Sequence, residues 1–466
     1  MKRRDTFRLI PLSMAGIAGL AREAFAQERP SHEIPPPPEP LAVRYLKKVT
    51  YMLTRIKNTQ SENMLEASYA VARTVQNGGA VWTNWDMGHN NRYDLFPERN
   101  GIPAYITPGY DMKRTKRGDL FLSSRAGGPE KDIVKKDIFV VGSPCPWSGD
   151  AKGRELLRPD VQEERLRPYA KIWVETNVTT HGAIMHLPGR PSPFGPVSGV
   201  LGLVTFWMIQ ADACRVLARE DVKMSVSGDE PALAGDNMPW TNLREPLMDD
   251  YFDRAVKQIG MICAELGDLR KTAKMAVDTV LAGGKVYCYS RYRNSLAAEG
   301  HHRRGGLTLT RGVCEVEGQL TSLDGNVPFR GTPKDCVIMG IWEPDDEVDL
   351  KNLDIFRKSG MKVASIGPMT RALRVPEGRT VPKESDIHIG RMCDTYGLYA
   401  FPGFERRVCP TSGPVINQMW WATCMEIAEE IIRRTGNSPG VFLSGALKGG
   451  REYNNYMMQA YHERGY

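Results

Sequence analysis

The stretch "SLAAEGHHRRGGL", residues 295–307, places a carboxylate next to two imidazoles. If Glu299 lies on a helix, His302 shares its face at spacing i, i+3, with His301 directly before it. A Glu that takes a proton and a His that returns one could move a proton between neighbouring carbon atoms. The same helix offers a plainer alternative, because Glu299 and Arg303 at spacing i, i+4 would form an ion pair. The sequence alone leaves both interpretations open.

Polar side chains that could bind a ligand follow several predicted strands. For His89 and Asn90 a turn would explain the same residues equally well, since Asn tolerates the left-handed conformation of turns, and for Arg291 and Arg293 a solvated basic loop would. Arginines offer bidentate recognition of phosphate or carboxylate. The predicted ligand-binding residues are His89, Asn90, Ser143, Ser148, Thr176, Asn177, Ser290, Arg291, Arg293, Asn294 and Ser295. The tyrosines of "VYCYS", residues 286–290, alternate along a predicted strand, and core packing is the simpler role for them.

The elements that must position these residues recur. "TVQNGGAVW" at 74–82 and "TVLAGGKVY" at 279–287 each indicate a helix end, a Gly-Gly stop and a strand. We pair the run at 138–143 with 336–341, and 170–177 with 361–368. Gly195-Pro196-Val197-Ser198 is likewise paired with Ser412-Gly413-Pro414-Val415. Four landmarks in one order indicate an internal duplication. Continuous apolar strands between helical segments indicate parallel sheets covered on both faces, hence two doubly wound α/β halves packed together.

The order of these motifs resembles the sugar isomerase (SIS) domain family. The features that match are Gly88-His89-Asn90, Glu299, the run 303–307 "RRGGL", the two Gly-Pro-Val motifs, and Phe442-Leu443-Ser444 with Gly449-Gly450 and Asn454. The resemblance covers about residues 45–466. It implies tandem flavodoxin-like αβα sandwiches forming a pseudo-dimer, with a phosphorylated sugar at the carboxyl ends of the strands. A Glu and a His would carry the isomerase chemistry, here Glu299 with His301 or His302.

Two loops depart from the family pattern, which has a Ser/Thr-rich loop around the phosphate. Residues 143–149 offer two serines with two prolines. In "GIWEPDDEVD" at 340–349, the carboxylates of Glu343, Asp345, Asp346 and Glu347 would repel a phosphate. Two functions therefore stay open: an enzyme that isomerises a sugar derivative, and a non-catalytic carbohydrate-derivative-binding or partner protein. A dinucleotide-dependent oxidoreductase is disfavoured, because neither half has G-x-G-x-x-G after a strand.

The N-terminal 26 residues predict export. They begin "MKRRDTF", become mildly apolar and end Ala24-Phe25-Ala26, which resembles a twin-arginine signal peptide and its cleavage site. We expect a periplasmic location, and we divide the chain into a signal at 1–26, a Pro-rich linker at 27–44, and SIS-like halves at 45–248 and 250–466. The signal contributes +3 of the net charge of +7, so no nucleic-acid partner is indicated. We expect a small-molecule sugar derivative as ligand and no cofactor, with homo-oligomer formation left open.

Metal binding and membrane insertion are not predicted. The chain has eight histidines, and His89, His301 and His302 lack the i, i+4 spacing of helical metal ligands. The most apolar later run, 200–209, is ended by Gln210 and Asp212. We therefore interpret it as part of a buried core helix rather than a membrane span.

Overall fold

The computed structural model describes residues 39–84, 100–123, 130–143, 167–178, 182–228, 232–233, 239–293, 295–371, 374–393 and 396–466. The predicted signal at 1–26 lies outside these residues, as does most of the linker. The first described helix, α2, begins at Leu41. The predicted boundaries of the two halves stay a prediction, and we use half one and half two for 45–248 and 250–466.

Half one contains a five-stranded, fully parallel sheet in the order β2-β1-β3-β4-β5. Its strands are β1 (Val81–Asn84), β2 (Ile106–Pro108), β3 (Leu120–Ser123), β4 (Phe139–Gly142) and β5 (Ala170–Trp173). Its other elements are α2 (Leu41–Gln76), α3 (Glu130–Lys136), the 3₁₀ turn η3 (Arg167–Tyr169), β6 (Ala183–Met185), β7 (Phe194–Pro196) and α5 (Ser198–Arg219). β6 and β7 form a separate antiparallel hairpin.

Half two repeats this arrangement, with five parallel strands in the order β9-β8-β12-β13-β14. The parallel strands are β8 (Val286–Ser290), β9 (Thr310–Val316), β12 (Cys336–Gly340), β13 (Lys362–Ile366) and β14 (Ile387–Ile389). Two antiparallel strands, β10 (Gln319–Ser322) and β11 (Val327–Pro328), extend one edge of this sheet. The strands β15 (Gly397–Tyr399) and β16 (Val408–Pro410) form a separate hairpin. The helices are α6 (Met248–Met261), η4 (Ile262–Glu265), α7 (Leu266–Leu281), α8 (Leu296–Glu299), α9 (Glu347–Lys358), α10 (Val381–Glu384), α11 (Ser412–Thr435) and α12 (Gly450–Arg464).

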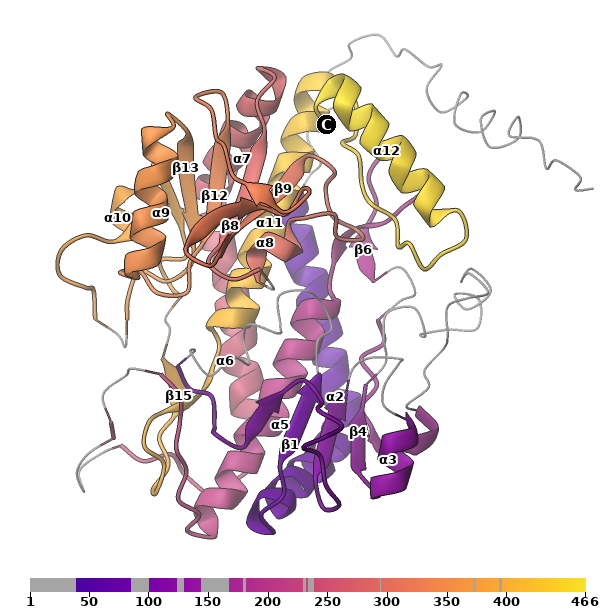
Figure 1. Ribbon diagram of the computed structural model, residues 1–466, viewed down its shortest axis with the longest axis vertical. Helices are drawn as coiled ribbons and strands as arrows, with labels where there is room; N and C mark the ends of the chain where they lie inside the picture. Colours follow the sequence, from indigo (N-terminus) through magenta and orange to yellow (C-terminus); the bar gives the residue numbers. More distant parts are fainter. Residues whose placement is uncertain are drawn as a thin grey trace, which may run out of the picture.

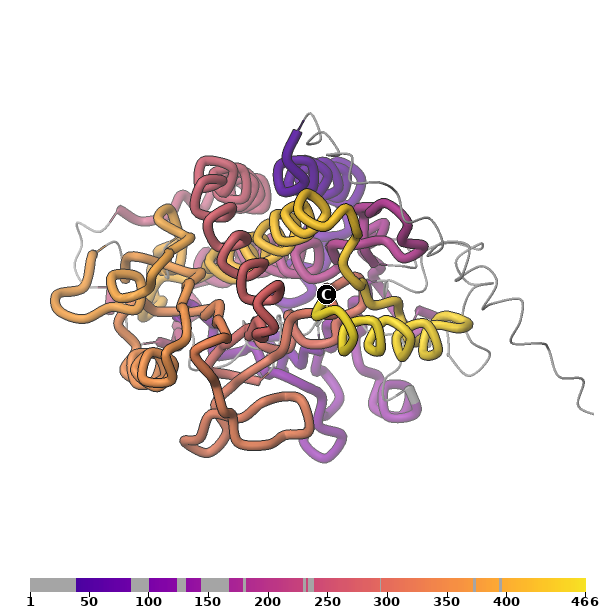
Figure 2. The backbone as a smooth tube through the Cα atoms, turned by 90° about the horizontal axis from the view of Figure 1, so that it is seen from above, coloured from indigo at the N-terminus to yellow at the C-terminus, as the bar shows by residue number. Residues whose placement is uncertain are grey.

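Both sheets have the 2-1-3-4-5 strand order of flavodoxin-like folds, which confirms the predicted fold class. The sheets lie at opposite ends of a central group of long helices (Figure 1). Viewed from above, α2, α6 and α11 lie on one side of the sheets, and α3 and α9 on the other (Figure 2). One hydrophobic core runs through both halves and contains the fully buried Tyr45, Trp207, Trp420 and Trp421.

The Gly-Gly landmarks occupy equivalent positions, as predicted. Each pair lies between a helix and the first strand of its sheet, and the second glycine is required by close packing. A side chain on Gly79 would meet the carbonyl oxygen of Gly118, and one on Gly284 would meet that of Lys334. The residue after each of these carbonyls is an aspartate that accepts a backbone N–H beside the glycine: Asp119 from Ala80 at 2.9 Å, and Asp335 from Lys285 at 2.8 Å.

The predicted pairing of 138–143 with 336–341, and of 170–177 with 361–368, was wrong by one strand. Asp335 precedes β12, and its equivalent Asp119 precedes β3, so β12 corresponds to β3 rather than to the run at 138–143. That run is β4, which corresponds to β13. Similarly, "AKIWVETN" contains β5 and corresponds to β14. The short apolar runs resemble one another too closely for sequence to separate them, whereas their order in the sheet is unambiguous.

The pairing of the Gly-Pro-Val motifs was wrong by four residues. The helices that follow begin at Ser198 and Ser412, which makes Pro196 equivalent to Pro410. Tyr45 donates its hydroxyl to the carbonyl of Pro196 at 2.6 Å, and Tyr251 donates to that of Pro410 at 3.1 Å. The residue before each proline has a left-handed conformation: Gly195 has a φ of 79° and Cys409 has a φ of 64°. The structural repeat is thus Pro-x-Ser-Gly.

Each half completes the other. The β6-β7 hairpin of half one reaches half two, where Gly195 donates its N–H to Gly305 at 2.9 Å. The β15-β16 hairpin reaches half one in the same way, with Cys409 donating to Gly101 at 3.3 Å. Carboxylates also cap helices across the halves. Asp212 of α5 accepts the first N–H groups of α6, and Glu426 and Glu429 of α11 accept those of α2.

The helix predicted to be buried, α5, is the one helix among the described residues that is long and apolar enough to cross a membrane. In the protein, 94% of its most apolar window is buried.

Candidate functional site

Glu299 lies in the core, at the point where half two meets α5 of half one. Its side chain is fully buried, and Oε1 accepts the indole N–H of Trp421 at 2.8 Å and pairs with Nε of Arg303 at 3.0 Å. Arg303 is equally buried and donates to the hydroxyl of Ser198 at 3.2 Å. Oε2 of Glu299 is buried and has no hydrogen-bond partner in the described part of the chain. The Glu299–Arg303 ion pair that the sequence left open as the plainer alternative is therefore present, and the second carboxylate oxygen is enclosed in the core.

His301 and His302 do not share a helical face with Glu299, so this premise of the prediction was wrong. α8 ends at Glu299, and His302 has a left-handed φ of 50°. The two imidazoles stack on each other, 4.1 Å apart between ring centroids, and turn toward Asp324. Burial lowers the pKa of His301 to about 4 and also lowers that of His302. Both rings are thus neutral at neutral pH.

The loop after β8 is held by its own contacts. Ser290 donates to the carbonyl of Tyr292 and accepts the N–H of Ala297, while Ser295 accepts the indole N–H of Trp342 at 3.1 Å. These two serines bind the protein rather than presenting free hydroxyls. Arg293 is exposed. As expected, the tyrosine side chains of β8 are core residues.

The carboxylates of 340–349 are neutralised in part by arginines. Asp346 accepts from Arg291 at 2.6 Å and also caps α9 through the N–H groups of Val348 and Asp349. Arg371 pairs with Glu343 at 3.2 Å and with Asp345 at 3.4 Å. Ion pairs thus occupy the carboxyl edge of this sheet, and an incoming phosphate would have to displace carboxylates from their arginines.

The carboxyl edge of the half-one sheet is different, because it carries short hydroxyl side chains. Ser123 is the last residue of β3, Ser143 follows β4, and Thr176 lies three residues after β5. β4 lies between β3 and β5, so the three residues follow adjacent strands at one edge. Oγ of Ser143 and Oγ1 of Thr176 are buried and have no hydrogen-bond partner among the residues that the structure describes. The structure thus brings Ser143 and Thr176 to the edge where parallel sheets bind ligands.

Asn177 follows in a left-handed conformation, with φ 54°, and its N–H donates to Glu175. It therefore shapes the turn after β5. The other predicted residues His89, Asn90, Ser148 and Asn294 lie outside the described residues.

Comparison with known proteins gave partial matches. No family model matches the sequence. The chain is 24% identical over 244 residues to a UPF0309 protein of Streptomyces griseus, covering 47% of this chain and 96% of that one. A solved protein of Clostridium difficile 630, proposed to be a phosphosugar isomerase, aligns over 85% of this chain and 94% of its own, with 8% identity and a TM-score of 0.44. The C-terminal domain of glucosamine-fructose-6-phosphate aminotransferase from Francisella tularensis aligns over 84% and 94%, with 11% identity and a TM-score of 0.39.

The strand order decides the fold. Two successive parallel sheets share the order 2-1-3-4-5, and each half sends its hairpin and its last long helix against the other half. The chain has a tandem flavodoxin-like fold. Four features of its site had no counterpart in the sequence analysis: the indole of Trp421, the hydroxyls of Ser198 and Ser123, and the carboxylate of Asp324. The first two lie more than 100 residues from the groups they bind, so no local pattern could reveal them.

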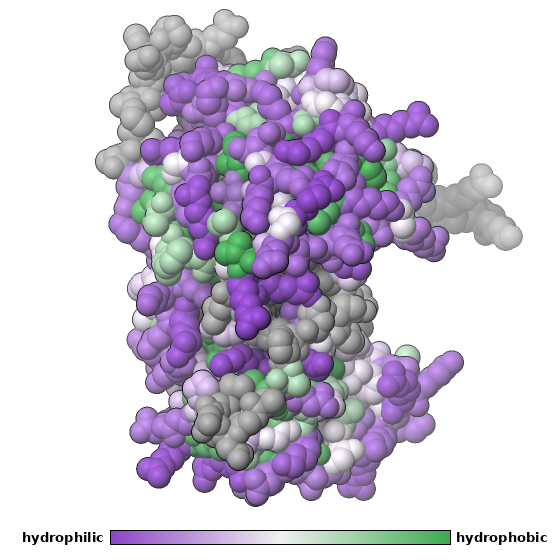
Figure 3. All heavy atoms as spheres, turned by 90° about the vertical axis from the view of Figure 1, so that its left-hand side faces the viewer, coloured by the Kyte–Doolittle hydropathy of each residue, from purple (hydrophilic) through white to green (hydrophobic). Residues whose placement is uncertain are grey.

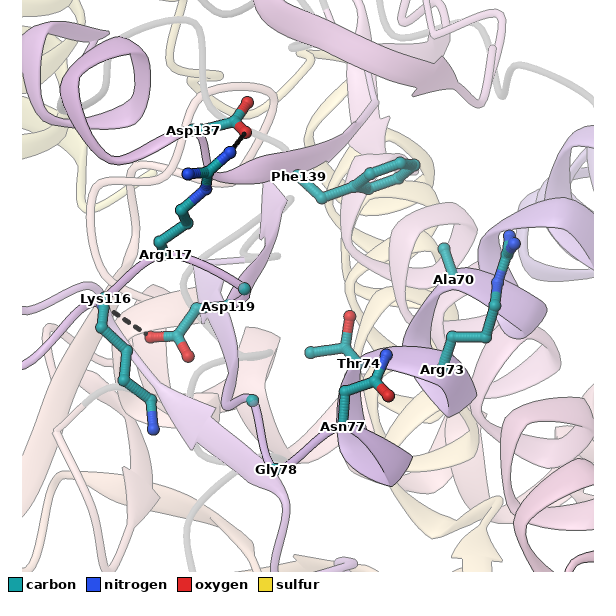
Figure 4. Close-up of a pocket in the computed structure, with 12 residues that line it drawn as sticks. Ala70, Arg73, Thr74, Asn77, Gly78, Lys116, Arg117, Asp119, Asp137 and Phe139 are labelled. Atoms are coloured by element: carbon teal, nitrogen blue, oxygen red, sulfur yellow. Dashed lines mark hydrogen bonds and ion pairs between the residues drawn. The ribbon is translucent and has the colours of Figure 1, made fainter.

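One cavity of the chain lies at the opposite edge of the half-one sheet. It has a volume of about 430 Å³ and lies between the end of α2 and the loops that precede β1, β3 and β4 (Figure 4). Its cationic lining residues are Arg73, Lys116 and Arg117, and Arg117 pairs with Asp137. Parallel sheets bind ligands at their carboxyl ends, and this cavity lies at the amino ends. We therefore do not assign it to the predicted site.

One side of the molecule is shown in space-filling form in Figure 3. Hydrophilic residues dominate this face, and apolar residues appear on it in small separate groups. Scattered apolar residues of this kind are ordinary for a protein surface and mark no docking site.

Proposed function

We propose that the chain binds a carbohydrate derivative, a sugar or sugar phosphate, at the carboxyl edge of the half-one sheet. The observation that carries this proposal is that the hydroxyls of Ser143 and Thr176 are buried and form no hydrogen bond with any described residue. A buried polar group without a partner costs about 1–3 kcal/mol, so a ligand that supplies the missing hydrogen bonds binds more favourably there. Sugar hydroxyls and phosphate oxygens both form hydrogen bonds with Ser and Thr hydroxyls.

We expect one ligand per chain. The corresponding edge of half two is occupied by the Arg291–Asp346 and Arg371–Glu343 pairs. Breaking these pairs would leave carboxylates facing the ligand, which disfavours a phosphate. The two halves have thus diverged: half one has the free hydroxyls, and half two has the buried Glu299.

Ser143→Ala should weaken binding of the ligand by about 2–10-fold, the effect of losing one neutral hydrogen bond. The measurement is isothermal calorimetry with a hexose 6-phosphate, the same hexose without phosphate, and inorganic phosphate. The matched control is Ser359→Ala, because the Ser359 hydroxyl bonds only to its own helix in half two. The proposal fails if none of the three probes binds, or if both variants bind with the affinity of the unmodified chain.

A second candidate function is proton transfer by Glu299, as in an aldose–ketose isomerase. It is favoured by one observation, the buried Oε2 that has no partner. Trp421 and Arg303 fix Oε1, so the carboxylate is held rigidly while its second oxygen forms no hydrogen bond within the described residues. General-base catalysis requires such a group within reach of the proton to be removed. If this candidate is wrong, the chain is the non-catalytic binding protein of the first proposal.

We also propose that the chain is exported to the periplasm by the twin-arginine route. This proposal rests on residues 1–26 alone, with Arg3-Arg4 near the start and Ala24-Phe25-Ala26 at the end. The exported chain should begin at Gln27, which intact mass spectrometry of a periplasmic fraction would reveal. A full-length mass, or a chain confined to the cytoplasm, would contradict the proposal.

A further inference from the structure

His301, His302 and Asp324 bring three potential metal-binding atoms together. These atoms all lie within 4.8 Å of one another. Oδ1 of Asp324 is 3.9 Å from Nε2 of His301 and 3.7 Å from Nε2 of His302. The histidines follow α8, and Asp324 lies in the turn after β10, so the cluster joins two separate loops of half two. The spacing of the histidines predicted no metal site, because that pattern does not include Asp324.

The carboxylate of Asp324 is oriented by a buried arginine. Nε of Arg311 is 3.2 Å from Oδ2 of Asp324, and the guanidinium stacks on the ring of Tyr461 at 4.0 Å. Two backbone carbonyls accept further hydrogen bonds from Arg311, so its position is fixed. Oδ2 is therefore occupied, while Oδ1 faces the imidazoles. Carboxylates that bind metals are commonly oriented by such an outer partner.

The backbone of His302 is strained in a way that supports a function for its ring. A φ of 50° is uncommon for a residue other than glycine, and residues in such conformations cluster at binding and catalytic sites. The conformation places the His302 ring between His301 and Phe442, whose ring centroid is 5.0 Å away. The imidazole is thus held in the cluster by packing on both sides.

We propose that His301, His302 and Asp324 bind one divalent transition-metal ion of the zinc class. Imidazole nitrogen and carboxylate oxygen are ligands that suit this class, with bonds of about 2.0–2.2 Å. Coordination therefore draws the three atoms closer together, which the half-exposed His302 and Asp324 can accommodate. Three protein ligands leave a tetrahedral ion one position for water or an external ligand.

The three ligands should contribute unequally. Nδ1 of His301 accepts the N–H of Gly312 in a long hydrogen bond of 3.4 Å. A neutral imidazole that coordinates an ion through Nε2 carries its proton on Nδ1, so coordination breaks this hydrogen bond. His301 should therefore be the weakest ligand. The bound ion would tie the segment after Glu299 to the turn after β10. This inference does not depend on the proposed sugar-binding function.

The test uses the full chain, free of any polyhistidine tag, stripped with EDTA and titrated with Zn²⁺ by calorimetry. We expect one equivalent to bind. His302→Ala and Asp324→Asn should each lower the affinity by at least about 10–100-fold, the loss seen when even an outer-shell partner is removed. His301→Ala should lower it less. His462→Ala removes an exposed histidine of α12 outside the cluster and should leave binding unchanged.

Thermal unfolding of each variant, measured without metal, establishes that the variant is folded before its affinity is compared. The proposal is overturned if the unmodified chain binds no zinc saturably. It is also overturned if folded His302→Ala and Asp324→Asn bind zinc as tightly as the unmodified chain, because the ion then binds elsewhere, for example at the partly exposed Cys263.

Discussion

Arg303→Met should lower the free energy of unfolding by about 3–5 kcal/mol, because it leaves Glu299 as a buried carboxylate without its cation. Glu299→Gln should cost a similar amount by leaving Arg303 unpaired. The double variant removes both charges and keeps an acceptor for the Trp421 indole, so it should be much more stable than the sum of the single effects predicts. Urea unfolding followed by both circular dichroism and tryptophan fluorescence measures all three.

Arg254→Gln is the control for this cycle, since it breaks an i, i+4 pair with Asp250 in which both side chains are about half exposed. It should cost no more than about 1 kcal/mol. Strictly additive costs in the Glu299 and Arg303 variants would show that the two charges do not stabilise each other, and the site would then need a different explanation.

Glu299→Gln should also reduce catalysis by about 10²–10⁴-fold if the chain is an isomerase, which is the usual contribution of a general base. The measurement is incorporation of solvent deuterium into a sugar phosphate, followed by NMR. The assay must be carried out under conditions in which the variant is folded, because the same substitution destabilises the core. Ligand affinity should change little, since the proposed binding hydroxyls lie in half one.

Two results would remove the isomerase candidate. One is a chain that binds a sugar phosphate yet incorporates no deuterium. The other is a folded Glu299→Gln variant that exchanges deuterium at the full rate. After either outcome, Glu299 has a structural role as the partner of Arg303 and Trp421. The chain is then better described as a non-catalytic binding protein.

The sequence was sufficient to predict the architecture of the two halves, but not to predict which of their later strands correspond to each other. The Gly-Gly stops predicted both first strands because tight packing against a carbonyl excludes a side chain at Gly79 and Gly284. The later strands were paired wrongly because Lys136-Asp137 resembles Lys334-Asp335 more than Gly118-Asp119 does. The order of the strands in each sheet and the hydrogen bonds of Asp119 and Asp335 identify the true equivalents.

The site was predictable only where local chemistry determined it. Ser143 and Thr176 follow strands, so their position at the carboxyl edge of a parallel sheet was predictable, and their role in binding stays a prediction. The end of α8 could have been anticipated from Gly300, since glycine commonly terminates helices. The surroundings of Glu299 could not, because Trp421 lies 122 residues away along the chain and Ser198 lies 105 residues from Arg303.

The exchange of helix caps between the halves has a consequence for synthesis on the ribosome. The first N–H groups of α2 at Leu41 and Ala42 are capped by carboxylates 388 and 384 residues further along. At about 5–20 residues per second, translation takes roughly 20–80 seconds to deliver those carboxylates. Half one is therefore synthesised first, with an uncapped first helix and an uncovered apolar face. Its fold is completed only after α11 of half two has been synthesised. During that interval its exposed surface would need protection, for example by a chaperone.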